Sequence, residues 1–292
     1  MNSLYRFISF PAFVNLVEKQ VERYVSPISW EDTYEGYLLR LIEKNDIKEV
    51  MEELMNTISP NNPEAALKNY LKLWSARWLC YGQCWTTLHE SDALWRIYSY
   101  DKMTVRIETD EPEINALFSA PELKKNYILE IREVKYDLDE DNGLKSFSEI
   151  LIQNKSTKLI TEPYFHKRKA FEHEREKRVL LLDNAVSQFH TGLPILATLN
   201  NYRRQNMETG NRPTPKEGID ILSKLVPKTR YPFSKENTSG DIYIEIPDVR
   251  SYIKSVMVHP QAEEWIVSLV EAICQRTGLC FKGKSNMYER IS

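Results

Sequence analysis

The chain has few residues of the kinds that mark the easily recognised classes of protein. Only four of its 292 residues are cysteine, and their spacings, C-x3-C and C-x5-C, match neither a zinc ribbon nor a redox C-x-x-C motif. The five histidines form neither an H-E-x-x-H nor an H-x-H pattern, so we expect no metal site. A formal net charge of −3 gives no whole-molecule field that would attract nucleic acid or an anionic membrane.

Long apolar runs are also missing. No run of about eighteen apolar residues occurs, so no segment is expected to span a membrane. The first residues lack the charged-then-apolar plan of a signal peptide. We therefore expect a cytoplasmic protein with reduced cysteines and no membrane partner.

What the chain does contain is enough apolar material, 42% of its residues, for a sizeable core. Alternating or compact apolar runs predict seven strands, separated by helices of uneven length and without a regular βαβ rhythm. This arrangement predicts a single α+β domain over residues 1–292, with one mixed, mostly antiparallel sheet and flanking helices. The expected strands are Leu4–Ile8, Trp78–Thr86, Met103–Glu108, Tyr127–Tyr136, Val179–Leu182, Ile242–Ile246 and Ser255–Val258.

The helical segments are predicted from apolar stripes and from their start and stop residues. One helix is expected over Pro11–Tyr24 and another over Gln261–Arg276, which ends before Gly278. A helical subregion over about 34–78 should hold at least three helices, broken near Asn45-Asp46 and at 59–63. Residues of about 185–240 show little apolar register and predict a long surface insertion.

Several short segments form a pattern, in order, along nearly the whole chain: Leu4–Phe7, Trp30–Glu35, Cys84–Thr86, Glu90–Ser99, Val134–Tyr136, Phe165–Lys167 and Phe171–Arg178. Together they resemble the bacterial domain-of-unknown-function family numbered 2971. Where that family has Asn-Asp-Pro-Phe-Glu, this chain has Glu-Asp-Thr-Tyr-Glu at 31–35, and about 185–240 has no counterpart. The resemblance implies a bacterial origin and a place among accessory or anti-phage defence genes, without a settled mechanism.

The segment 174–178, Glu-Arg-Glu-Lys-Arg, is the sharpest candidate for chemistry. If it is a strand, Glu174, Glu176 and Arg178 point to one face. One carboxyl would then have its pKa raised by its like-charged neighbour, and Arg178 could hold a substrate phosphate. An exposed strand edge laced with ion pairs explains the same pattern, and the sequence leaves both open.

The order of residues along the chain is also similar to that in ADP-ribosyltransferase-type proteins. Arg6, then Thr86 or Thr87, then Glu174-x-Glu176 stand in the order arginine, hydroxyl residue, late Glu-x-Glu. This resemblance implies NAD as substrate and a glutamate that stabilises an oxocarbenium-like transition state. The expected catalytic residues are Glu176, Glu174, Arg178 and Arg6, and the expected substrate-binding residues are Tyr5, Thr86, Trp95, Tyr98 and Lys167.

His166 and His173 lie close to this segment in the sequence, where either could assist proton transfer. Near the C-terminus, residues 278–285 satisfy the pattern G-x-x-x-x-G-K-[ST]. A phosphate-binding loop needs a strand before it and a helix after it, whereas here a helix precedes and seven residues follow. We therefore reject a nucleotide-binding loop at this position.

Two other classes of function remain open. Basic residues gather at about 200–235, which predicts a partner that carries phosphate, nucleic acid included, if the segment is not simply a solvated loop. Alternatively, the helices of 34–78 could dock a protein partner, which would make the chain a non-catalytic adaptor. The basic residues are Arg203, Arg204, Arg212, Lys216, Lys224, Lys228, Arg230 and Lys235.

Overall fold

A computed structural model describes residues 3–30, 36–138, 161–184, 193–210, 213–225 and 240–288. Its main sheet has seven strands in the order β5-β6-β3-β1-β4-β8-β9, and a two-stranded sheet pairs β2 with β7. Every neighbouring pair in the large sheet is antiparallel except β8 and β9, so the predicted α+β class with a mixed, mostly antiparallel sheet is confirmed. The strands are β1 (Ser3–Ile8), β2 (Val21–Tyr24), β3 (Cys80–Thr86), β4 (Val105–Asp110), β5 (Tyr127–Glu133), β6 (Glu176–Asp183), β7 (Ile242–Glu245), β8 (Ser255–Val258) and β9 (Phe281–Lys284).

The first helix is shorter than its apolar stripe predicted. Helix α1 (Phe10–Lys19) begins where the Ser9 side chain accepts the Ala12 N–H, and it ends at Gln20, which adopts a left-handed φ of 51°. The predicted helix over Pro11–Tyr24 is therefore wrong for its last turn, because residues from Val21 onward form β2. Glutamine carries no sequence signal for a left-handed stop, which glycine would have given.

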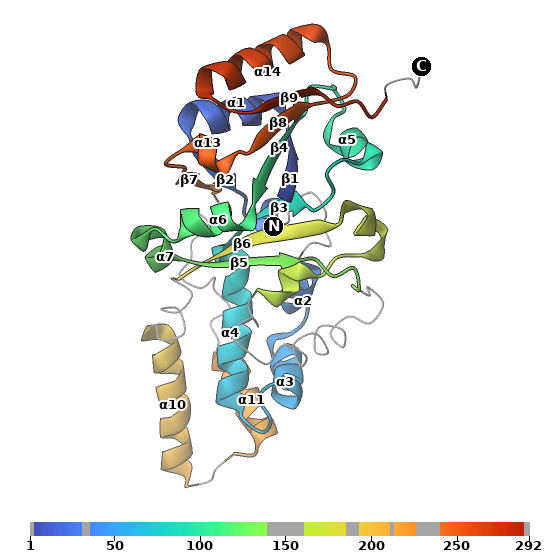
Figure 1. Ribbon diagram of the computed structural model, residues 1–292. Coiled ribbons are helices and arrows are strands. Elements are labelled where there is room, and N and C mark those ends of the chain that lie inside the picture. The colour runs from blue at the N-terminus through green and yellow to red at the C-terminus, as the bar shows by residue number, and fades with distance from the viewer. Residues whose placement is uncertain are drawn as a thin grey trace.

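Both faces of the sheet around β6 are covered. Val179 and Leu181 point into one apolar core and Leu180 and Leu182 into another, and all four are buried. Figure 1 shows α1, α13 and α14 at one end of the molecule and α2, α3, α4, α10 and α11 at the other, with β5 and β6 between them. The helices on the first side are α1, α6 (Glu111–Phe118), α7 (Pro121–Asn126), α13 (Val249–Tyr252) and α14 (Glu264–Thr277).

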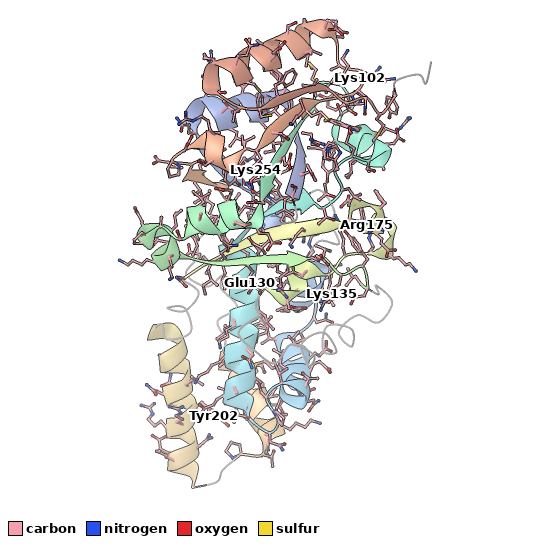
Figure 2. All side chains as sticks on the ribbon, in the orientation of Figure 1. Lys102, Glu130, Lys135, Arg175, Tyr202 and Lys254 are labelled. Carbon is pink, nitrogen blue, oxygen red and sulfur yellow. The ribbon has the colours of Figure 1, made fainter. Side chains whose placement is uncertain are left out.

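The predicted helical subregion is present, with breaks where they were expected. It consists of α2 (Tyr37–Lys44), α3 (Ile47–Thr57) and α4 (Pro63–Leu79). The insertion, in contrast, is not only a loop: α10 (Leu193–Thr209) and α11 (Pro215–Leu225) complete the same core. Tyr202, labelled on α10 in Figure 2, is buried in that core. Across the described residues, no helix is long and apolar enough to cross a membrane.

The large sheet is weakly joined between β1 and β3. Only Tyr5 and Thr86 pair across this seam, whereas β3 and β6 pair along seven positions. Farther along β3, Gly82 instead exchanges both backbone hydrogen bonds with Val25, the residue after β2. In Figure 1, β1 and β4 run steeply while β5 and β6 cross the molecule from side to side. The two halves of the sheet therefore separate at this seam.

Candidate functional site

A cavity of about 290 Å³ lies where β1 and β3 separate. Its lining is mainly apolar and aromatic, with charged side chains from β1, β2, β6 and the turn before β6. Six of the nine residues predicted from the sequence line it, although they come from distant parts of the chain. The lining residues are Tyr5, Arg6, Phe7, Ile8, Ala12, Arg23, Val25, Trp30, Gly82, Gln83, Cys84, Trp85, Thr86, Leu94, Tyr98, Glu174 and Glu176.

Strand register explains how the predicted residues meet. Tyr5 of β1 pairs with Thr86 of β3, and Thr86 pairs with Glu176 of β6, so the three residues form one row across three strands. Residues directly opposite one another in antiparallel strands project to the same face. A single row therefore carries an aromatic ring, a hydroxyl and a carboxylate along one edge of the cavity.

The two glutamates reach the cavity by different routes. Glu174 ends a 3-10 helix, η4 (Lys169–Glu174), and Arg175 follows with a left-handed φ of 42° before β6 begins at Glu176. The predicted strand over 174–178 is thus wrong for its first two residues. Thr86 fixes the turn, because its hydroxyl donates to the Glu174 carbonyl at 2.7 Å.

Two cations lie behind these carboxylates. Lys167 Nζ donates to Glu174 Oε2 at 2.7 Å and to Glu176 Oε2 at 3.2 Å. Arg178 Nε donates to Glu176 Oε1 at 2.6 Å. Burial by itself disfavours the charged carboxylate, but Arg178 and Lys167 outweigh it and hold the pKa of Glu176 well below its usual range. The expected raised pKa is therefore not found for Glu176, which is ionised at neutral pH.

Arg178 does not take the phosphate-holding place predicted for it. Its side chain is 0% exposed and is absent from the cavity lining, and it also donates to the Tyr164 carbonyl. Its guanidinium lies 4.4 Å from the centre of the Trp30 ring, and Trp30 in turn lines the cavity. Arg178 therefore positions Glu176 and Trp30 and does not face a ligand.

Lys167 and Trp95 are the other two predicted residues that do not line the cavity. Lys167 is buried between the glutamates and the Phe171 ring, so it positions carboxylates where we expected it to bind substrate. Trp95 is fully buried under Phe7 and His259, and its Nε1 donates to Glu90 at 3.1 Å. It belongs to the core, and the substrate-binding role predicted for it is not supported.

Tyr98 reaches the cavity from α5 (Asp92–Tyr98), one turn after Trp95. Its ring is stacked on Phe7, with 6.3 Å between the ring centres and 18° between the planes. Tyr5, Phe7, Trp30, Trp85 and Tyr98 thus give the cavity aromatic walls on several sides. Planar aromatic groups pack well against such walls.

Arg6 lines the opposite side of the cavity, and its carboxylate partner lies behind it. Glu22 is fully buried and receives two hydrogen bonds from Arg6, at 2.7 and 2.9 Å, and a short one from Gln83. Gln83 also accepts from Trp85 Nε1 at 3.1 Å, and the Arg6 guanidinium lies 4.7 Å from the Trp85 ring centre. Attraction to Glu22 outweighs burial and raises the pKa of Arg6.

Sequence reasoning missed Glu22, Gln83, Trp30 and Cys84. Glu22 fell inside a predicted helix, where it would have been exposed, and Gln83 looked like an ordinary strand residue. Trp30 borders the segment 31–35 that departs from the resembling family, but 31–35 itself lies outside the described residues. The Cys84 thiol is half-buried, lines the cavity and donates a hydrogen bond to Glu176, whereas Cys80 and Cys274 are buried and Cys280 is exposed.

The two histidines proposed for proton transfer are elsewhere. His166 is buried, with Nδ1 2.6 Å from Asp137 and Nε2 3.1 Å from Glu162, and does not line the cavity. His173 is exposed and, with Thr87, lines a neighbouring cavity of about 530 Å³ that also reaches Glu176. Neither histidine is placed beside the Glu174–Glu176 pair within the first cavity.

The basic residues predicted at about 200–235 are paired only in part. Arg203 and Arg204 pair with Glu64 and Glu208, whereas Lys216 and Lys224 are exposed and form no ion pair with a described residue. Arg212 and the segment 226–239, with Lys228, Arg230 and Lys235, lie outside the described residues. Residues 281–284 form strand β9, which agrees with the rejection of a phosphate loop there. Within the described ranges, no group of His, Cys, Asp and Glu side chains could hold a metal ion.

Comparison with known proteins adds no relative: no family model, no curated protein and no solved structure matches the chain. The resemblances to family 2971 and to ADP-ribosyltransferase-type proteins therefore stay predictions, and the cavity at the β1–β3 seam is identified from its own geometry and charges.

Proposed function

We propose that the protein is an enzyme that acts on a nucleotide such as NAD, in the manner of ADP-ribosyltransferases, with Glu176 at the reaction centre. One observation carries the proposal: Arg6, Thr86, Glu174 and Glu176, singled out by their order along the chain, line one cavity. A chain of this length contains many arginines, threonines and glutamates, and their meeting in one aromatic-walled cavity is not required by sequence order.

The charge state of Glu176 suits the chemistry. In this reaction the bond between ribose C1′ and the nicotinamide nitrogen breaks, and its electron pair leaves with nicotinamide. Positive charge then develops on the ribose, and an acceptor or water adds to C1′ and releases a proton. A carboxylate that is already ionised and fixed by Arg178 and Lys167 would stabilise this charge without reorganising. Its two oxygens accept from Arg178, Lys167 and the Cys84 thiol, which leaves acceptor capacity for one ribose hydroxyl.

The cavity also suits one end of a dinucleotide. Its volume of about 290 Å³ is near the lower end for small-molecule sites, so we expect it to enclose the nicotinamide–ribose part and not the whole molecule. The nicotinamide ring would pack between aromatic side chains such as Phe7 and Trp85, with Arg6 on the side away from the glutamates.

The decisive experiment is mass spectrometry of NAD and related metabolites after incubation with purified protein, alone and in a bacterial extract. Wild type should consume NAD or form an ADP-ribosylated product, and Glu176→Gln should not. Glu122→Gln is the matched control, because it makes the same chemical change on an exposed side chain of α7 that lines neither of the two cavities reached by Glu176. Thermal melting of both variants separates lost chemistry from lost folding.

Binding can be measured separately from turnover. Cys84 lines the cavity and Cys280 is exposed, so NAD should slow alkylation of Cys84 and leave Cys280 unchanged. An unchanged metabolite pool together with unprotected Cys84 would refute the proposal for NAD and direct attention to nucleic-acid and protein partners.

A further inference from the structure

A second cavity, of about 330 Å³, lies on another side of helix α5. It shares no lining residue with the first cavity: α5 contributes Leu94 and Tyr98 to the first and Arg96 to the second. Its lining is polar, and none of its described lining residues is a carboxylate. Those residues are Arg96, Ser99, Lys102, His259, Gln261 and Tyr288.

His259 lines this cavity and has one defined ring hydrogen-bond donor. It is only 4% exposed, and its ring packs edge-on against Trp95 with 5.4 Å between centres. Nδ1 accepts the Gln261 backbone N–H at 3.0 Å, so the hydrogen of the neutral ring is on Nε2. Burial and the nearby Lys102 lower the pKa of His259, which keeps the ring neutral at pH 7.

The turn that carries Ser99 and Lys102 is fixed at several points. Ser99 Oγ accepts the Thr104 N–H at 3.3 Å, and the Thr104 hydroxyl donates to the Tyr98 carbonyl at 2.5 Å. The His259 N–H donates to the Thr104 carbonyl at 3.2 Å, which ties the turn to β8. Lys102 has a left-handed φ of 59°, a conformation that is unfavourable for lysine and is found most often at functional sites.

Two described acids lie beside lining residues: Asp92 bonds to Arg96 and Tyr288 of the lining, and Asp101 precedes Lys102 in the chain. Asp92 accepts from Arg96 Nε at 2.9 Å and from the Tyr288 hydroxyl, and the Asp101 carboxylate accepts the Met103 N–H at 2.9 Å. Neither lines the cavity. Lys102 is exposed, and its amine forms no ion pair within the described part of the chain. Lys102 therefore gives the cavity a cation with which no described acid pairs, whereas Arg96 is paired with Asp92.

We propose that this cavity binds a phosphate group, held by Lys102 and Arg96 and by the Nε2–H of His259. A tetrahedral oxyanion offers acceptors in several directions, and the lining offers a lysine, a guanidinium, an imidazole N–H, a hydroxyl and an amide. The same chemistry is present in inorganic phosphate and in a nucleoside monophosphate. This site does not depend on the reaction proposed for the first cavity.

The test is a ¹H–¹⁵N NMR titration of the full chain with sodium phosphate at constant ionic strength. Saturable shifts are expected at Ser99, Lys102 and Gln261, and the titration of the His259 ring should move to higher pH when phosphate is bound. Lys102→Gly should weaken phosphate binding about tenfold, the usual effect of removing one charged donor. Glycine accepts the left-handed φ, so this variant should melt at or above the wild-type temperature.

Lys282→Ala is the charge-matched control, because Lys282 is exposed on β9 and does not line the cavity. It should leave binding unchanged. Tighter binding of adenosine monophosphate than of phosphate, lost equally in Lys102→Gly, would support the site and identify the phosphate as part of a larger ligand. Each of three results would overturn the proposal: shifts of equal size with sodium chloride, wild-type affinity in Lys102→Gly, or binding that does not saturate below about 10 mM phosphate. The concentration limit follows because even weak sites have a Kd near the millimolar range.

Discussion

The two charged walls of the first cavity present opposite members of their ion pairs to the cavity. On the β1 side the cation Arg6 lines the cavity, and its acid, Glu22, is buried behind it. On the β6 side the acids Glu174 and Glu176 line the cavity, and their cations are buried behind them. Each wall contains paired charges, yet the cavity meets a positive group on one side and negative groups on the other.

This difference separates structural from functional charge. Buried ion pairs need hydrogen bonds to offset the loss of water, and both walls provide them. Glu22 is inaccessible and can only hold Arg6, Gln83 and the strand ends together. Glu176 has the same kind of partners but faces the cavity, where its charge acts on a ligand. We therefore expect Glu22 to matter for stability and Glu176 for chemistry.

The largest effect is expected in the rate of NAD consumption, where Glu176→Gln and Glu22→Gln should differ most. Removing the charge of Glu176 should lower the rate of NAD consumption by about 10²–10³-fold, as loss of a preorganised electrostatic stabiliser does. Glu22→Gln should lower the free energy of unfolding by about 3 kcal/mol, because it breaks a buried pair, with a much smaller change in rate. Metabolite mass spectrometry and denaturant unfolding measure the two quantities. Equal rate losses in two well-folded variants would contradict the distinction between the walls.

A methyl group at Gly82 should damage the β6 wall selectively. A Cβ placed there would lie 2.7 Å from the Trp30 ring, and that ring covers Arg178. Gly82→Ala should therefore displace Trp30 and cost about 1–3 kcal/mol in the free energy of unfolding, as overpacking does. Gly240→Ala is the control, since no described atom lies within 4 Å of its Cβ. Thermal melting and Trp fluorescence report the change, and a wild-type spectrum for Gly82→Ala would refute the packing argument.

The contrast between the walls also shows what a sequence can reveal. Chain order singled out Arg6, Thr86 and Glu176, and the strands that carry them, β1, β3 and β6, are neighbours in the sheet and so bring them to one seam. Chain order cannot show which member of an ion pair faces a cavity. That depends on segments packed behind β6, such as the Tyr164 carbonyl that receives Arg178.

Helix α5 gives a second example. Trp95 and Tyr98 stand three residues apart and so share a helix face, and the sequence predicted a binding role for both. The two residues differ in burial. Phe7 of β1 and His259, which follows β8, cover Trp95 completely, whereas Tyr98 extends past Phe7 to the cavity. Pairing of these strands with α5 is a long-range contact that periodicity does not encode.

Opposite pH dependences should distinguish two buried clusters. The His166 ring lies between Asp137 and Glu162, and it must carry a hydrogen on each nitrogen to donate to both carboxylates. Glu162 also forms ion pairs with Arg132 and Lys135. Burial alone would lower the pKa of His166, but the two carboxylates raise it. This stability is fully present below the unfolded pKa of about 6.5 and is lost as pH rises through the raised folded pKa. The lowered pKa of Glu176 acts in reverse: its stability is present above about 4.3 and is lost as pH falls.

Melting temperatures between about pH 2, the folded pKa of Glu176, and about pH 9, above the unfolded pKa of histidine, test this prediction. His166→Gln should flatten the fall on the alkaline side and leave the acid side intact. Glu176→Gln should weaken the acid-side fall only. An alkaline fall that persists unchanged in His166→Gln would mean that the imidazolium does not hold this cluster together.

The smallest effect is expected far from both walls, at the basic residues of α10. Arg203 donates to Glu64 at 2.7 and 3.1 Å, but the pair is exposed, and exposed pairs contribute about 0–1 kcal/mol. Arg203→Ala with Arg204→Ala should therefore change the free energy of unfolding by less than about 1 kcal/mol. Because acids already pair with both arginines, the double variant should also leave the salt dependence of any nucleic-acid binding unchanged. Fluorescence anisotropy with labelled DNA and RNA at several salt concentrations measures that slope. A slope reduced by about one per lost phosphate contact would instead support a nucleic-acid partner for this end of the molecule.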